Sequence, residues 1–124
     1  MEPATIAAQL RELAVYYELD GDRHRAFAYQ RAANSVGAAN GLHRLLDEGR
    51  LEELPGVGQS IARVVAELAR RGTVEVLDRL RAKWPAVVIE MTQLKGLGIP
   101  KARKLYEVLK PVSLDEVAAA ARNG

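Results

Sequence analysis

The residues best suited to chemistry lie in two Gly-x-Gly turns that are 40 positions apart. Gly56-Val57-Gly58 follows Leu54, and Gly96-Leu97-Gly98 follows Leu94. Glycine permits a positive φ and carries no Cβ, so another molecule can approach the backbone closely. The amides that begin the next helix lack intrahelical acceptors and point outward with the positive end of the helix dipole. Each turn is therefore predicted to bind a phosphate oxygen through main-chain N–H groups.

The similarity continues beyond the turns, because Ala62-Arg63 and Glu67 recur as Ala102-Arg103 and Glu107. A single Gly-x-Gly is most simply a tight turn that caps a helix, but two copies in one register favour phosphate binding. The amides or side chains predicted to contact phosphate belong to Gly56, Gly58, Ser60, Arg63, Gly96, Gly98, Lys101, Arg103 and Lys104.

Other candidate chemistry is sparse. The carboxylates of Asp20-Gly21-Asp22 resemble a metal-binding pair, but they follow a helical stretch, and we interpret them as the end of one helix and the N-cap of the next. The chain has no cysteine and only two histidines, His24 and His43. This composition excludes disulfides and thiolate metal sites and argues against structural zinc.

Charge is unevenly distributed along the 124 residues. The net charge is +2, made up of −1 over residues 1–50 and +3 over residues 51–124. Four basic residues and no acidic one occur between Lys95 and Lys104. Such a cluster suits a polyanionic partner, but charge alone favours the simpler interpretation of a solvated helix face. No signal-peptide pattern or membrane-length apolar run is present, so we expect a cytoplasmic protein that does not bind membranes.

The hydrophobic periodicity predicts an all-α protein, with no sustained alternation typical of strands. A helix is predicted over Thr5–Leu19, with Ile6, Leu10, Leu13 and Tyr17 on one face. A second helix is predicted over His24–Val36, with Phe27, Ala28, Arg31 and Ala32 on one face. Further helices are predicted in the stretches 42–54 (interrupted at Gly49), 61–71, 85–94 and 99–110 and after Ser113, with Gly72 as a helix stop and Thr73 as the next N-cap. Two small helical lobes, 1–82 and 83–124, would each hold one hairpin, joined near Trp84-Pro85.

The sequence Leu54-Pro55-Gly56-Val57-Gly58 followed by Ala62 resembles the helix-hairpin-helix motif, which binds DNA backbone without sequence preference. The segment from His24 to Ala33 is similar to a helix of the 8 kDa domain of family X DNA polymerases, the polymerase beta-like group. This likeness covers residues 5–124. It implies sequence-independent DNA binding in repair of the base-excision type, on gapped, nicked or single-stranded ends, and a 5′-phosphate pocket at His24, Arg25 and Tyr29.

The same resemblance implies a Na⁺ or K⁺ ion at each hairpin, held by main-chain carbonyls; no other cofactor is expected. The matching positions are Glu52, Leu54 and Val57 in the first hairpin and Thr92, Leu94 and Leu97 in the second.

The resemblance also raises two enzymatic activities that the residues argue against. Lyase-competent relatives use a lysine where this chain has Val64, and no lysine precedes Lys83, whereas Schiff-base chemistry requires a positioned amine. The family's phosphate-pocket lysines correspond here to Glu52, Ser60 and Val76. No palm-type carboxylate set is present for two-metal polymerisation.

We therefore expect a non-catalytic, monomeric DNA-binding unit without a small-molecule substrate, either free-standing or fused or bound to a polymerase palm. Two alternatives stay open. One is a protein-protein scaffold in a repair complex that docks a partner on Val57 and Leu97. The other is a 5′-deoxyribose phosphate lyase that uses an atypical amine, such as Lys83 or the N-terminus.

Overall fold

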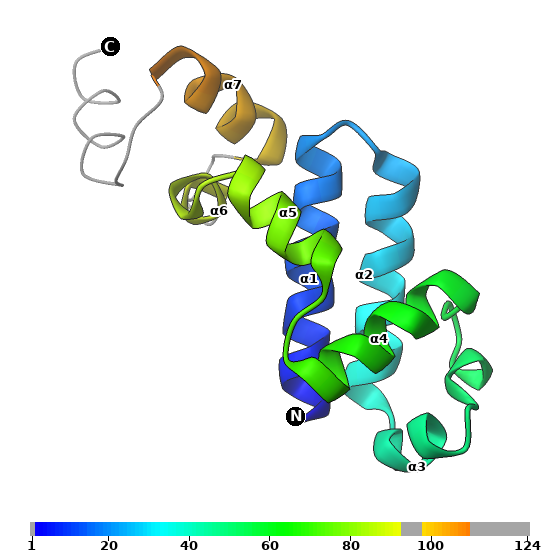
Figure 1. Ribbon diagram of the computed structural model, residues 1–124. Helices are drawn as coiled ribbons and strands as arrows, with labels where there is room; N and C mark the ends of the chain where they lie inside the picture. Colours follow the sequence, from blue (N-terminus) through cyan, green and yellow to red (C-terminus); the bar gives the residue numbers. More distant parts are fainter. Residues whose placement is uncertain (1, 93–97, 110–124) are drawn as a thin grey trace. The chain divides into compact units, whose positions relative to one another are not determined.

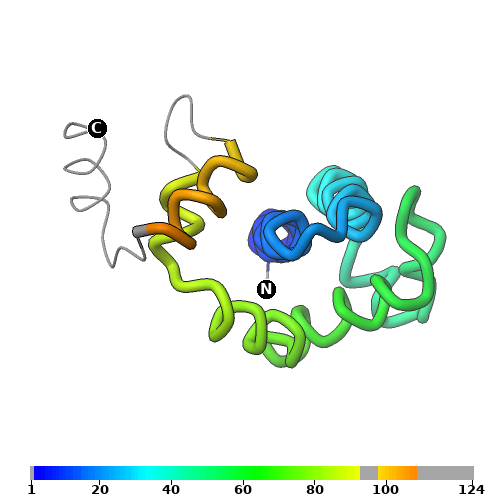
Figure 2. The backbone as a smooth tube through the Cα atoms, turned by 90° about the horizontal axis from the view of Figure 1, so that it is seen from above, coloured from blue at the N-terminus to red at the C-terminus, as the bar shows by residue number. Residues whose placement is uncertain are grey.

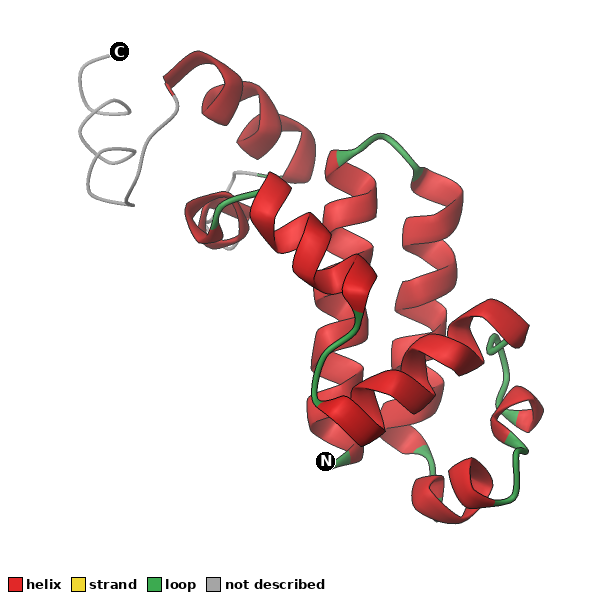
Figure 3. Cartoon of the chain, viewed as in Figure 1, coloured by secondary structure: helices red, strands yellow, loops and turns green. Residues whose placement is uncertain are grey.

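All regular structure in the described residues, 2–92 and 98–109 of the computed structural model, is helical (Figure 3). The elements are α1 (Pro3–Leu19), α2 (Arg23–Ala38), α3 (Leu42–Asp47), the 3-10 helix η1 (Leu51–Glu53), α4 (Gln59–Arg71), α5 (Glu75–Lys83), α6 (Ala86–Thr92) and α7 (Ile99–Leu109). These ranges contain no strand, which confirms the all-α prediction. None of their helices combines the length and apolar character needed to cross a membrane. The helix predicted after Ser113 lies outside the described residues.

The chain forms two compact units, residues 1–78 and 79–124. The division falls within α5, a few residues before the predicted boundary at residue 82. The first unit holds the first Gly-x-Gly turn, and the second unit holds α6 and α7, which flank the second turn.

The first unit is built on α1 and α2, which lie side by side and run in opposite directions (Figures 1 and 2). Asp20 caps the end of α1, and Gly21 has a φ of 86° that allows the chain to reverse. The side chain of Asp22 then accepts a hydrogen bond from the amide of Arg25 at 3.0 Å and caps α2. The predicted role of this Asp-Gly-Asp segment as a helix junction is confirmed.

The core between α1 and α2 pairs large side chains with small ones. The predicted stripe of α1 is buried, with Ile6, Leu10 and Leu13 fully enclosed. α2 buries a different stripe from the predicted one, made of Ala26, Tyr29, Ala32, Ala33 and Val36. Alanines at the contact let the helices approach closely and leave room for the leucines of α1. Phe27, predicted to be buried, is 66% exposed, so that part of the prediction is wrong.

The first hairpin consists of α3 and η1, the turn at residues 54–58, and α4, which packs against α1 (Figure 1). Gly49 separates α3 from η1, as predicted. α4 ends at Gly72, whose φ of 76° is left-handed and whose amide donates to the carbonyl of Leu68. The predicted capping role of Thr73 is wrong, because α5 begins at Glu75 and the hydroxyl of Thr73 bonds Asp78 at 2.7 Å.

The turn of this hairpin rests on α2. Gly56 has a φ of 78°, and a Cβ at this position would lie 3.2 Å from Cγ of Arg31. The hydroxyl of Ser35 donates a hydrogen bond to the carbonyl of Pro55. One turn of α2 therefore holds the tip of the hairpin, and glycine at position 56 is required by both conformation and space.

The second unit packs around Trp84, which is buried. Its ring lies 6.4 Å from the ring of Tyr106, centroid to centroid. Val88 and Met91 of α6 and Ala102 of α7 are fully buried. The amide of Ala102 bonds the carbonyl of Gly98 at 2.9 Å, as the amide of Ala62 bonds Gly58 at 2.9 Å. Both helices therefore start in the same way, which the 40-residue repeat predicted.

Replacing Gly56 by alanine should destabilise the first unit by about 1–2 kcal/mol, because a left-handed residue with a Cβ is strained and Arg31 must move. Gly58→Ala is the matched control. Gly58 has a φ of −90° and open space at its Cβ position, and its replacement at the N-cap should cost less than about 1 kcal/mol. Urea denaturation of both variants measures the difference, and equal losses of stability would contradict this assignment of the turn.

Candidate nucleic-acid interface

The first turn carries the residues whose main-chain amides are predicted to bind phosphate. Gly56, Gly58 and Ser60 are exposed. Within the described part of the chain, no carbonyl or side chain accepts a hydrogen bond from their N–H groups. The first amide of this segment with a helical acceptor is that of Ala62, which bonds Gly58. The turn thus presents a set of unused donors at the positive end of the dipole of α4, as an anion site requires.

Glycine at position 58 has no conformational explanation within the protein. Its φ of −90° is accessible to any residue, and a Cβ would meet nothing within 4 Å. Serine, aspartate or asparagine would cap α4 better than glycine does. Glycine leaves the neighbouring amides open to an approaching ligand, because even a methyl group at this position would stand in front of them. Gly98 resembles Gly58 in this respect, since among the described residues the atom nearest to its Cβ position is Cδ of Pro100 at 3.8 Å.

Arg63 adds an available positive charge in the first turns of α4. Its side chain is exposed and has no ion pair with any described residue. Its nearest acidic neighbour on the helix, Glu67, lies 4.0 Å from Arg71 instead. The guanidinium of Arg63 can therefore add Coulombic attraction to the hydrogen bonds that the amides offer.

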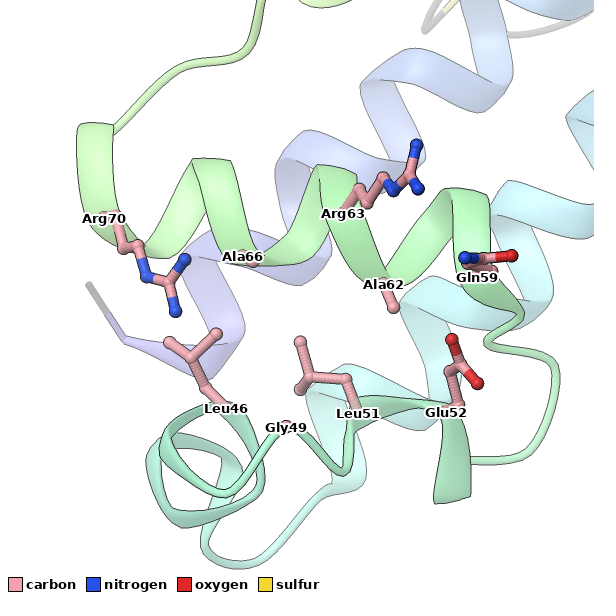
Figure 4. Close-up of a pocket in the computed structure, with 9 residues that line it drawn as sticks. All are labelled: Leu46, Gly49, Leu51, Glu52, Gln59, Ala62, Arg63, Ala66 and Arg70. Carbon is pink, nitrogen blue, oxygen red and sulfur yellow. The ribbon is translucent and has the colours of Figure 1, made fainter.

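A groove of about 290 Å³ separates the two arms of the first hairpin (Figure 4). Leu46 and Leu51 point from the lower arm toward α4, Leu46 near Arg70 and Leu51 near Ala66. Glu52 also lines the groove, but its carboxylate forms no ion pair with Arg63. The small residues of α4 let the arms lie close to each other, and this packing holds the turn between them.

A second pocket, of about 410 Å³, gathers the three residues predicted to bind a 5′-phosphate. His24, Arg25 and Tyr29 line it from α2, and Ser60 lines it from the start of α4. The pocket therefore adjoins the exposed amides of the turn. Tyr17, which the sequence reasoning did not single out, also lines it, and its ring lies 5.1 Å from that of Tyr29.

The polar groups of this pocket are held in place by their neighbours. Arg25 lies over the ring of Tyr17, 5.2 Å from its centroid, and 3.7 Å from Asp22. Burial raises the pKa of Tyr29, and neighbouring Tyr17 raises it further against the opposing charge of Arg25. Like an ordinary tyrosine, Tyr29 is protonated at physiological pH, and its hydroxyl shares a side-chain hydrogen bond with Tyr17.

The floor of the same pocket is apolar where a lyase would need an amine. Val64 and Val76 line it with Ile61. Of the positions equivalent to the lysines of the repair enzymes, Ser60, Val64 and Val76 lie in this pocket, and Glu52 lies in the other groove. The geometry offers charge and hydrogen bonds but no lysine amine at this site.

The second hairpin differs from the first in the burial and ion pairing of its arginine. Arg103 is half-buried, donates to Glu107 at 3.0 Å and lies 6.0 Å from the centroid of the Trp84 ring. Lys101 and Lys104 are exposed, and neither forms an ion pair with a described residue. The predicted positions Gly96, Leu94 and Leu97 lie outside the described residues.

Two further observations bear on the alternatives. Val57, proposed to dock a protein partner, is only 4% exposed and packs inside its own unit, so that role is wrong for this residue. Within residues 2–92 and 98–109, no three His, Asp or Glu side chains lie close enough together to hold a metal ion.

Comparison with known proteins identifies the family to which the first hairpin belongs. Residues 1–74 match a family model described as "Helix-hairpin-helix domain". The chain is similar to DNA polymerase/3′-5′ exonuclease PolX of Bacillus subtilis (strain 168), with 29% identity over 110 residues, which are 88% of this chain and 19% of that protein. It is also similar to DNA polymerase lambda of Rattus norvegicus, with 28% identity over 102 residues, which are 82% of this chain and 17% of that protein.

The chain therefore spans about a fifth of the length of these curated relatives. The predicted resemblance to the N-terminal region of family X DNA polymerases is confirmed. Because the family model covers more than half of the sequence and includes the whole first hairpin, the chain belongs to the helix-hairpin-helix domain family.

Proposed function

We propose that this protein binds DNA through the phosphate backbone, using the amides at the start of α4. The observation that carries the proposal is the exposed, unbonded state of the Gly56, Gly58 and Ser60 N–H groups. The match to a helix-hairpin-helix family and the similarity to two DNA polymerases support the same class of ligand. Since amides recognise phosphate and not bases, sequence preference should be slight.

A second phosphate contact is proposed at the start of α7. Gly98, Lys101 and Lys104 are exposed there, and the α7 start repeats the geometry of the α4 start. Arg103 would have to leave Glu107 to join them, so the lysines are better placed to supply the charge. Two contacts suit DNA with a nick or gap. The total of about two to four neutralised phosphates implies micromolar, salt-sensitive binding.

The pocket between α2 and α4 would accept a terminal 5′-phosphate. Arg25 supplies charge, Tyr29 supplies a hydroxyl donor, and His24 and Ser60 complete the polar rim. A terminal phosphate there would lie close to the amides that hold the backbone. One DNA end could therefore engage both features of the first unit.

A Na⁺ or K⁺ ion at the first hairpin is proposed on the basis of its carbonyls. The carbonyl oxygen of Leu54 accepts a hydrogen bond from the amide of Val57 at 3.1 Å and keeps a second lone pair. No amide of the described residues donates to the carbonyls of Glu52 or Val57. Such oxygens fit a hard cation, whose charge would add to that of the amides. Thr92 would contribute the corresponding carbonyl in the second hairpin.

We infer that the chain carries out no chemistry on DNA by itself. The pocket has Val64 where an amine would be needed, and its tyrosine remains protonated. The proposed role is that of a monomeric DNA-binding part of a repair polymerase, which a palm domain would complete in the same chain or in a partner. Base-excision repair is the setting that the resemblance to family X DNA polymerases implies.

The double variant Gly58→Ala/Gly98→Ala should lose at least about tenfold in affinity for gapped DNA, because each methyl group blocks charge-assisted hydrogen bonds to phosphate. Fluorescence anisotropy on duplex, gapped and single-stranded DNA at two salt concentrations measures the change. The glycines have room for a Cβ within the protein, so circular dichroism should show an unchanged fold. A folded variant that binds as tightly as the parent would rule out phosphate binding by these amides.

Borohydride treatment in the presence of DNA that bears a 5′-deoxyribose phosphate should trap no covalent adduct. The candidate amines are the N-terminus and Lys83, and the described residues that line the pocket include no lysine. Mass spectrometry of the treated protein provides the readout. An adduct at Lys83 or at the α-amine would show that the chain is a lyase with an atypical nucleophile.

A further inference from the structure

The chain's single phenylalanine lies on the outside of the molecule. Phe27 is in the middle of α2 and is 66% exposed, while α2 buries alanines, a valine and a tyrosine against α1. A large apolar side chain at such a site is not explained by packing within the unit. Exposed aromatic rings are the groups on which proteins stack unpaired bases.

The surroundings of Phe27 are cationic. Arg23 and Arg31 lie one turn before and one turn after it on the same face of α2, and both are exposed. Neither arginine forms an ion pair or another polar contact with a described residue. α2 contains no acidic residue, so nothing on this helix neutralises the two charges. We refer to Arg23, Phe27 and Arg31 as the α2 face.

The α2 face is continuous with the phosphate-binding turn. The aliphatic part of Arg31 packs beneath Gly56, as the 3.2 Å approach to its Cβ position shows. Phe27 precedes Arg31 by four residues, which corresponds to about 6 Å along the helix axis. Stacked nucleotides repeat at about 3.4 Å along one strand, so a strand held at the turn needs about two nucleotides to reach the ring.

We propose that the α2 face binds a single-stranded extension of the DNA, with one unpaired base stacked on Phe27 and its flanking phosphates near Arg23 and Arg31. The inference rests on the proposed DNA-binding function and extends it to a second, aromatic contact. A protein partner would require a cluster of apolar side chains at the centre of its contact. The α2 face offers one ring between two cations, which is the arrangement that single-strand binding uses.

Three substitutions at this one position separate stacking from general hydrophobic contact. With a labelled oligothymidylate and the full chain, Phe27→Ala should weaken binding by about 5- to 100-fold, the range found for loss of one stacking ring. Phe27→Leu should weaken binding to a similar extent, since leucine keeps apolar area but has no π face. Phe27→Trp should bind at least as tightly as the parent.

Val108→Ala is the matched control, because Val108 is 75% exposed and is not part of the α2 face. It should leave oligothymidylate binding within about twofold of the parent. Binding of blunt duplex DNA should be unchanged in all three Phe27 variants, because no unpaired base is available to stack. Surface substitutions of this kind rarely disturb stability, and circular dichroism verifies the fold.

Equal oligothymidylate affinity for the parent and Phe27→Ala would overturn the proposal, and so would a Phe27→Leu variant that binds like the parent. The glycine variants separate this failure from failure of the proposed function. If Phe27→Ala has no effect but Gly58→Ala/Gly98→Ala weakens binding, phosphate binding stands and stacking fails. If only Phe27→Ala weakens binding, stacking stands and the hairpin proposal fails.

Discussion

The docking of the hairpin tip onto α2 is the contact on which the rest of the interface depends. Gly56 adopts a left-handed conformation directly over Arg31, and Ser35 holds the carbonyl of Pro55. The carbonyl of Pro55 is thereby tied to α2, and the amides of Gly56, Gly58 and Ser60 that follow have no acceptor among the described residues. A loose tip would make the same donors reorganise at each encounter, and the entropy lost on ordering them would weaken binding. The turn is therefore organised before a phosphate arrives.

The same contact brings two other features of the first unit close to the amides. α2 carries the polar residues of the pocket on the side toward α4 and the α2 face on its exposed side. One helix thus links the proposed terminal-phosphate pocket, the proposed backbone site and the exposed ring of Phe27. Residues 1–78 carry nine Lys/Arg and twelve Asp/Glu, a net charge of −3. The proposed contacts with a DNA end therefore depend on where the basic and polar groups lie and not on the overall charge of the first unit.

Sequence reasoning recovered the features that depend on local chemistry. The helix junction at Asp22, the helix stop at Gly72 and the equal starts of α4 and α7 follow from capping residues and from the 40-residue repeat. It misplaced Phe27, because hydrophobicity alone puts a large ring in the core, whereas the close approach of α1 and α2 selects alanine at their contact. The contact of Arg31 with Gly56 joins residues 25 positions apart and has no local signal.

The different states of the two repeated arginines could have been foreseen in part. Glu67 is followed four residues later by Arg71, which takes its carboxylate and leaves Arg63 free. In the second copy the position of Arg71 is occupied by Pro111, and Glu107 pairs with Arg103 instead. A single substitution beyond the motif therefore changes the charge that the motif can present, although the turn itself is repeated.

The central claim is that unbonded main-chain amides at the first turn bind DNA phosphate, and an amide-resolved NMR titration with gapped DNA tests it most directly. The N–H resonances of Gly56, Gly58 and Ser60 should move to lower field as they gain a charged acceptor, and these shifts should diminish as salt is added. If DNA binds while these three resonances stay in place and others move, the amides are not the site and the account is wrong.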